Sequence, residues 1–268
     1  MGVFEEIGLQ DEYDIINNYY NIDEIDYSSH IQFKELLLQQ LRECISNESI
    51  MLKNMMRVSL ELFLFYLDKM EGNPNKFIEV INKSDYTILK CNQEIIFQSI
   101  SLNKNLESCD DMIDKNNIMN FCMKRYQDLV ENASKHLSLF MEMINVKSNT
   151  FNQKDINGTL HNKINKLQSY KRLEWILKLI NRGLRNKIGH FNAFYNFKKC
   201  VFRDDKKKVI CTYSQFHQDN LNIAAFEYGF NNSLLYLILL YMKEDNFIQE
   251  YICKVQEYIG IEIVKYDV

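Results

Sequence analysis

Arg185 and His190 are the two side chains whose types and spacing best suit chemistry on a phosphate group. The guanidinium of arginine is permanently charged, and its planar fork of N–H donors fits phosphate oxygens. The imidazole of histidine exchanges protons near neutral pH, so it can act as a general acid or base. Asn186 directly follows the arginine, and Gly189 directly precedes the histidine. This stretch predicts a site that holds a phosphate while a proton is transferred.

The predicted site lies in the most basic part of an acidic protein. The 268 residues carry a formal net charge of −4. Residues 158–210 contain 14 lysines and arginines and only three acidic residues, so this region carries +11 and the rest of the chain −15. A cationic region of this kind can hold a polyanion through phosphate contacts and counterion release. The alternative interpretation is that these lysines only cover the solvated faces of helices.

Helices are expected to position this region. The chain has one proline and eight glycines, whereas sheet proteins need turn residues at short intervals. A mainly α-helical fold is therefore predicted. The hydrophobic residues, 46% of the chain, are enough for one large core or two smaller ones. Apolar side chains recur at helical spacing in six stretches, at residues 29–45, 50–70, 110–146, 159–184, 222–242 and 246–259. The stripe at 159–184 is the most regular, and it predicts one amphipathic helix that leads into Arg185.

The apolar period changes to two after Tyr195, which predicts a β-hairpin near residues 198–213. Residues 198–203 and 208–213 would be its strands, joined by a loop at 204–207. This hairpin interrupts the otherwise helical pattern.

The simplest register of that hairpin places Val201 opposite Ile210 and Cys200 opposite Cys211. A disulfide could join the two cysteines, but reduced thiols suit a cytosolic protein better. The chain has seven cysteines, an odd number, and none of them forms a C-x-x-C pair. Without such ligand spacing or a glycine-rich nucleotide loop, we expect no metal and no cofactor.

The N-terminal part differs from the rest in charge. The first thirty residues contain eight acids and no lysine or arginine, so they lack the basic segment of a secretory signal. The longest apolar run, residues 234–242, is about half of the roughly 20 residues that span a bilayer. We therefore expect a soluble, cytoplasmic protein with an acidic and helical extension at residues 1–108 and a helical domain at 109–268.

The pattern Arg185-Asn186-x-x-x-His190 resembles the Arg-x4-6-His signature of the HEPN (higher eukaryotes and prokaryotes nucleotide-binding) superfamily, whose variants often place a polar residue after the arginine. The resemblance covers these six residues closely and extends loosely to the predicted helices from about 109 to 245. It implies a HEPN-like helical bundle, with the hairpin near 198–213 as an insertion. It also implies a homodimer in which two motifs form a metal-independent endoribonuclease site, often within toxin–antitoxin, abortive-infection or other phage-defence systems.

The resemblance makes His190 the acid/base, Arg185 the phosphate stabiliser and Asn186 an accessory. In such a reaction the 2′-hydroxyl of RNA attacks the adjacent phosphorus, which leaves a 2′,3′-cyclic phosphate and a free 5′-hydroxyl. An antitoxin or regulatory protein is a further implied partner. Four basic residues are expected to bind the RNA: Arg182, Lys187, Lys198 and Lys199.

Geometry limits how one copy could use the motif. Residues five apart on an uninterrupted helix point about 140° from each other. Arg185 and His190 therefore converge only if the helix breaks near Asn186 or Gly189, or if each copy of a dimer contributes half of a shared site.

The competing function is a non-catalytic HEPN-type module that dimerises or docks a nucleotide, RNA or a partner protein. A separate, purely structural interpretation is that Arg185 pairs with a carboxylate and that His190 is a satisfied, partly buried histidine. The remaining histidines are expected to be surface or packing residues: His30, His136, His161 and His217.

Overall fold

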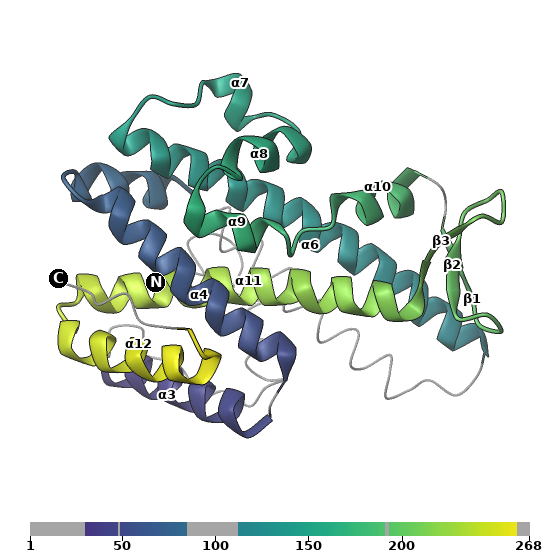
Figure 1. The fold of residues 1–268 in the computed structure, drawn as a ribbon, viewed down its shortest axis with the longest axis horizontal. Coiled ribbons are helices and arrows are strands. Elements are labelled where there is room, and N and C mark those ends of the chain that lie inside the picture. The colour runs from purple at the N-terminus through teal and green to yellow at the C-terminus, as the bar shows by residue number, and fades with distance from the viewer. Residues whose placement is uncertain (1–29, 48, 85–111, 191–192, 262–268) are drawn as a thin grey trace, which may run out of the picture.

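The computed structural model describes residues 30–47, 49–84, 112–190 and 193–261, with a small sheet at one end of the longest axis (Figure 1). Because 77% of the described residues are helical, the prediction of a mainly α fold with a β-hairpin insertion is confirmed. The helices are α3 (His30–Asn47), α4 (Ile50–Met70), α6 (Met112–Lys147), α7 (Gln153–Ile156), α8 (Leu160–Leu167), α9 (Lys171–Leu177), α10 (Arg182–His190), α11 (Tyr213–Tyr241) and α12 (Asp245–Ile259). The strands are β1 (Phe194–Asn196), β2 (Val201–Arg203) and β3 (Val209–Thr212), and residues 74–84 are also helical.

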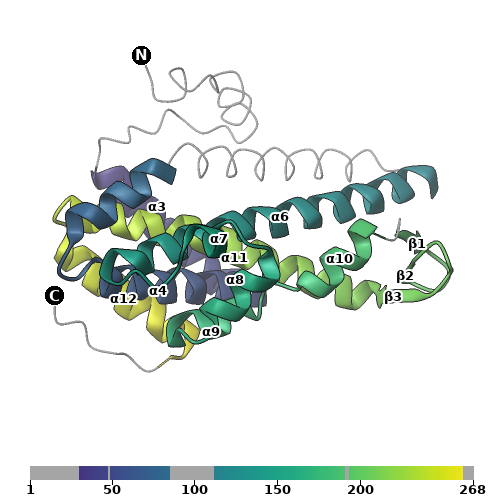
Figure 2. The same cartoon turned by 90° about the horizontal axis from the view of Figure 1, so that it is seen from above.

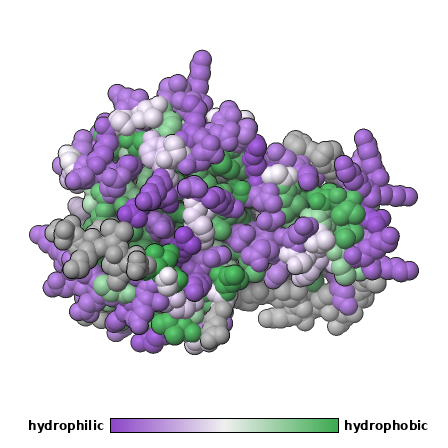
Figure 3. All heavy atoms as spheres, in the orientation of Figure 1, coloured by the Kyte–Doolittle hydropathy of each residue, from purple (hydrophilic) through white to green (hydrophobic). Residues whose placement is uncertain are grey.

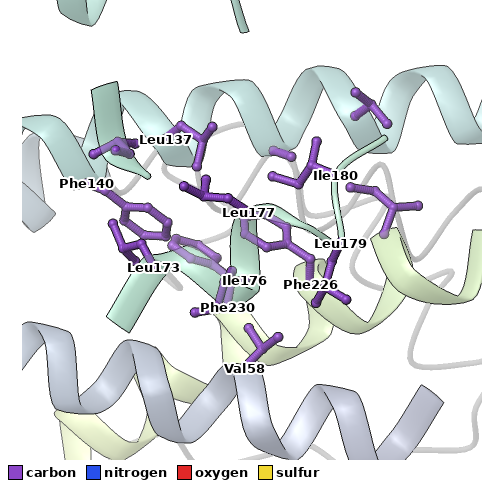
Figure 4. Packing of buried hydrophobic residues seen from close by; sticks show 14 of the residues in the cluster. Val58, Leu137, Phe140, Leu173, Ile176, Leu177, Leu179, Ile180, Phe226 and Phe230 are labelled. Carbon is purple, nitrogen blue, oxygen red and sulfur yellow. The ribbon is translucent and has the colours of Figure 1, made fainter. Parts of the chain in front are cut away.

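Helices α4 and α11 cross at the centre of the molecule and share its main core with α6 and α9 (Figures 1 and 2). The crossing is close, because a Cβ placed on Gly229 of α11 would lie 2.6 Å from Cβ of Val58 in α4. Figure 4 shows this core, in which side chains of all four helices meet: Val58, Leu137, Phe140, Leu173, Ile176, Leu177, Phe226 and Phe230. The predicted domain boundary at residue 108 lies outside the described residues. Helix α4, which precedes that boundary, shares its core with α6, α9 and α11, which follow it.

A second core cluster joins α3 and α12 to the other side of α4 and α11. Its centre contains Leu37 of α3, Phe63 of α4, Tyr236 of α11 and Tyr251 of α12, all nearly inaccessible to solvent. The ammonium of Lys34 also pairs with the carboxylate of Glu244 at 2.7 Å. Helices α3 and α12 lie at the end of the molecule opposite the sheet (Figure 1).

The single helix expected at residues 159–184 is wrong, because the segment forms the three short helices α8, α9 and α10. Polar side chains accept backbone amides where α8 and α10 begin, whereas α9 begins at Lys171 without a side-chain cap. Oγ1 of Thr159 accepts the amide of Asn162 at 3.4 Å before α8, and Oδ1 of Asn181 accepts the amide of Leu184 at 3.1 Å before α10. The breaks let each short helix take its own direction. The apolar stripe nevertheless remains largely buried, so the apolar residues of α10 still face the core.

The sheet is antiparallel in the order β1-β2-β3, and the pair of β2 and β3 is the expected hairpin. The predicted register is wrong, since Val201 pairs with Thr212 and Phe202 pairs with Cys211. A register irregularity between Phe202 and Arg203 causes part of this shift. The observed register buries Phe202 and Cys211 on one face, where the ring of Phe202 packs against Phe216 at 4.4 Å between centroids.

Cys200 lies in the turn before β2 with φ of 50°, so the expected pairing with Cys211 is also wrong. Strand β1, which pairs with β2, was not predicted. The described cysteines are free: Cys44, Cys122, Cys200, Cys211 and Cys253.

Helix α11 begins nine residues earlier than its apolar pattern predicts. Thr212 and Gln215 form a capping box, in which each side chain accepts a hydrogen bond from the backbone amide of the other residue. Among the described residues, α11 is the one helix long and apolar enough to cross a membrane, and 67% of its apolar window is buried in the protein. This burial is typical of a core helix and is compatible with a soluble protein.

Candidate functional site

Helix α10 carries the motif residues as one unbroken helix that ends at His190. Its buried side chains Leu184 and Ile188 anchor it to the core, and α10 packs against α6 and β3. No break occurs near Asn186 or Gly189, so the positions of Arg185 and His190 lie about 140° apart around the helix axis. The structure describes His190 by its backbone. The expected helix break, which would have let one copy bring the two side chains together, is therefore not found in α10.

Arg185 lies on the side of α10 that faces α6. Its guanidinium forms an ion pair with Glu131 of α6, and its Nη1 donates to Oδ1 of Asn186 at 3.2 Å. The side chains of Arg185 and Glu131 are 32% and 47% exposed, so the pair borders solvent. The purely structural interpretation of Arg185 predicted such a carboxylate partner. Exposed ion pairs contribute only about 0.2–1 kcal/mol, so a bound phosphate can replace Glu131 at small cost.

A groove of about 410 Å³ runs beside α10, between this helix, β3 and the start of α11. Lys187 lines it, together with the apolar residues Leu184 and Ile210 and the polar ends of Gln215 and Gln218. His190 follows Lys187 by three positions, and residues three apart are neighbours on one side of a helix. The groove therefore borders the side of α10 on which position 190 lies, away from the ion pair of Arg185.

Burial raises the pKa of two groups in this groove. Burial raises the pKa of Asp219, and the hydrogen bond that it accepts from Nδ2 of Asn181 at 2.9 Å acts in the opposite direction. Burial also raises the pKa of the Cys211 thiol to about 11. A thiol with this pKa stays protonated at neutral pH and is a weak nucleophile. The thiol of Cys211 is therefore not a candidate nucleophile, and Asp219 is the described carboxyl group that lines the groove.

The four predicted RNA-binding residues fall into two places. Arg182 and Lys187 lie on α10, beside the motif, and Lys187 is exposed. Lys198 and Lys199 are exposed in the turn between β1 and β2. Figure 3 shows hydrophilic side chains extending outward from the end of the molecule that carries the sheet, next to an apolar area. Both places can contact a polyanion, and the cations of α10 lie on the same helix as the motif.

A buried pair of a histidine and a glutamate in the core was not predicted from the sequence. Nε2 of His136 lies 3.0 Å from Oε2 of Glu227, and their side chains are 2% and 0% exposed. The imidazole also stacks on Phe230 with ring centroids 3.8 Å apart. The position of Glu227 inside an otherwise apolar stretch of α11 was a signal that it needed a buried partner. This pair lies in the core between α6 and α11, and it does not join the motif.

The other histidines were expected to be surface or packing residues. His161 is exposed and contacts Asn165, and His217 is exposed and stacks on Tyr213. The side chain of His30 lies outside the described part of the chain. Within that part, no group of three or more histidine, cysteine, aspartate or glutamate residues could hold a metal ion.

Comparison with models of known protein families, with curated proteins and with solved structures found no match to this chain. The fold and the motif residues are thus the observations from which a function can be inferred.

Proposed function

We propose that this protein is a metal-independent endoribonuclease whose active site combines His190 of one copy with Arg185 of a second copy. The observation that carries this proposal is the unbroken helix α10, which places an arginine and a histidine on different sides of one basic, solvent-facing helix. A twofold axis beside α10 would bring the two types of side chain together from two copies. The resemblance of residues 185–190 to the HEPN motif supports the same arrangement.

In the proposed reaction, His190 accepts the proton of a ribose 2′-hydroxyl. The 2′-oxygen attacks the adjacent phosphorus, the bond from phosphorus to the 5′-oxygen breaks, and an imidazolium returns a proton to that leaving oxygen. Arg185 stabilises the negative charge that gathers on the five-coordinate phosphate. No water enters this step, so the products are a 2′,3′-cyclic phosphate and a 5′-hydroxyl.

Asn186 and Glu131 act as positioning residues in this proposal. The hydrogen bond from Arg185 to Oδ1 of Asn186 orients the guanidinium. Glu131 holds the same guanidinium in the free protein, and an RNA phosphate takes its place on binding. The basic residues Arg182 and Lys187 on α10 contact neighbouring phosphates, while Lys198 and Lys199 contact the strand farther along.

The biological setting is proposed from the motif alone. We infer a cytoplasmic toxin or phage-defence nuclease that acts as a homodimer and is restrained by an antitoxin or another regulatory protein. The second candidate is a non-catalytic module that uses the same surface to bind a nucleotide, RNA or a protein. The ion pair of Arg185 with Glu131 favours this second candidate, because it gives the arginine a structural partner.

Identification of the RNA ends separates the two candidates. The purified protein should cleave single-stranded RNA in the presence of EDTA and leave 2′,3′-cyclic phosphate and 5′-hydroxyl ends. The variant with both Arg185→Ala and His190→Ala, purified in parallel, controls for contaminating nucleases. Cleavage that requires a metal, or that leaves 3′-hydroxyl and 5′-phosphate ends, would rule out the proposed mechanism. RNA binding without cleavage would favour the non-catalytic module.

A further inference from the structure

Four aromatic rings form a row from the sheet to the surface of α11. The ring centroids of Phe197 and Tyr195 are 4.8 Å apart, and those of Tyr195 and Tyr213 are 6.0 Å apart. His217 stacks on Tyr213 with centroids 5.9 Å apart and ring planes within 9° of parallel. Tyr213 is 44% exposed, and His217 is exposed as well. The row therefore ends in a parallel pair of rings that is open to solvent.

Buried aromatic side chains hold this row in place from behind. Tyr195 packs against Phe202 at 4.9 Å between centroids, and Phe202 packs against Phe216 at 4.4 Å. The backbone amide of Tyr213 donates to the carbonyl of Cys200 at 2.9 Å, which ties α11 to the turn between β1 and β2. Because these contacts already order the rings, a ligand that stacks on them loses little conformational entropy.

Lysines are concentrated in the two turns of the sheet, one of which is bonded to Tyr213. Lys198 and Lys199 lie in the turn that ends at Cys200, the residue bonded to Tyr213. Three more lysines, Lys206–Lys208, lie in the turn between β2 and β3 at the other end of these short strands. Within the described ranges, no carboxylate forms an ion pair with any of these five lysines. Their charge is therefore available to an anionic ligand.

The acids within this segment do not cancel that charge. Asp204 is almost fully buried, and its Oδ1 accepts the amide of Lys208 at 2.7 Å, so its role is to close the turn. Asp205 is exposed beside it. Solvent-facing cations thus predominate at this end of the molecule, where flat rings are also exposed.

We propose that Tyr213 and His217 are a stacking platform for the bases of single-stranded RNA, whose phosphates lie against Lys198 and Lys199. Exposed aromatic faces beside a basic surface are the combination that binds single strands, because unpaired bases can stack while the backbone is neutralised. Bases in a duplex are already stacked and paired, so they cannot use the rings. The choice of RNA rests on the proposed function, and the exposed rings restrict the substrate to single strands.

Strand β3 packs against both α10, which carries the motif, and α11, which carries the platform. His190 precedes Phe194, the first residue of β1, by four positions, and the three residues of β1 lead toward the turn that contains Lys198. A strand advances about 3.3 Å per residue, so β1 itself covers only a short distance. An RNA strand stacked on Tyr213 can therefore extend along the sheet to α10.

The test is RNA affinity measured in a His190→Ala protein, which should bind RNA without cutting it. Fluorescence anisotropy with a labelled single-stranded oligonucleotide should show about 5- to 150-fold weaker binding for Tyr213→Leu. Tyr213→Phe keeps the ring and should bind normally. The matched control is Tyr241→Leu, because Tyr241 is 77% exposed at the opposite end of α11 and should not affect binding.

Charge and strand type give two further readouts. The double variant Lys198→Gln, Lys199→Gln should lower the dependence of log affinity on log salt by about 1.4, or about 0.7 for each phosphate that the protein no longer neutralises. A duplex of the same sequence should bind more weakly than the single strand. Equal affinity of Tyr213→Leu and the parent protein, or equal binding of duplex and single strand, would overturn the proposal.

These outcomes are distinguishable from failure of the proposed nuclease. If the wild-type protein does not cleave RNA but Tyr213→Leu still weakens binding, the platform stands and the nuclease does not. If the wild-type protein cleaves RNA and Tyr213→Leu binds normally, the nuclease stands and the platform does not.

Discussion

Replacing His190 by alanine should lower the rate of RNA cleavage by about 10²- to 10⁴-fold. The proposed reaction needs a group that takes a proton from the 2′-hydroxyl and returns one to the leaving oxygen, and alanine can do neither. RNA affinity should change little, because Arg182, Lys187 and the lysines of the sheet remain. Single-turnover cleavage and anisotropy measured on the same protein separate the two quantities.

His161→Ala is the matched control for this prediction. His161 is an exposed histidine on α8 that contacts only the nearby Asn165 among its described hydrogen-bonding partners. Its removal should leave cleavage unchanged. If His190→Ala cleaves RNA as fast as the wild-type protein, His190 is not the acid/base, and the binding-module function becomes the better explanation of the motif.

The largest loss of stability from a small change should follow Gly229→Ala. A Cβ at this position would lie 2.6 Å from Cβ of Val58 and 2.8 Å from the carbonyl oxygen of Met55. The second contact is to the backbone of α4, so α4 and α11 have to move apart where they cross. Such overpacking costs about 1–3 kcal/mol, and urea denaturation should show it as a lower free energy of unfolding.

Gly183→Ala provides the opposite expectation. The nearest atom to a Cβ at position 183 is Oδ1 of Asn181 at 3.4 Å, an ordinary contact with a side chain. Alanine favours a helix over glycine by up to about 1 kcal/mol, so this variant should be as stable as the wild-type protein or more so. Equal free energies of unfolding for Gly229→Ala and the wild-type protein would show that α4 and α11 are not packed this closely.

Most helix positions could be predicted because their apolar side chains repeat at helical spacing. The expected helices at 50–70 and 246–259 agree closely with α4 and α12. The same signal failed at 159–184, where a continuous apolar stripe passes over three separate helices. At the break before α10, Oδ1 of Asn181 accepts the backbone amide of Leu184, and periodicity does not register a hydrogen bond from a side chain to the backbone.

The parts of the site that could not be predicted depend on residues far apart in the chain. Glu131 precedes Arg185 by more than fifty residues, so the ion pair becomes visible only when α10 packs on α6. The groove combines residues of α10, β3 and α11 in the same way. By contrast, the exposure of Lys187, Lys198 and Lys199 was foreseeable, because charged side chains of this kind are rarely buried without partners.

A mixture of two inactive variants tests the shared active site most directly. Arg185→Ala and His190→Ala proteins should each be inactive, but a mixed dimer keeps one intact pair of Arg185 and His190. With free exchange of subunits, about half of the dimers are mixed and each has one working site of two, so cleavage should return to about a quarter of the wild-type rate. Cleavage by the mixture no faster than by either variant alone would contradict a site shared between two copies.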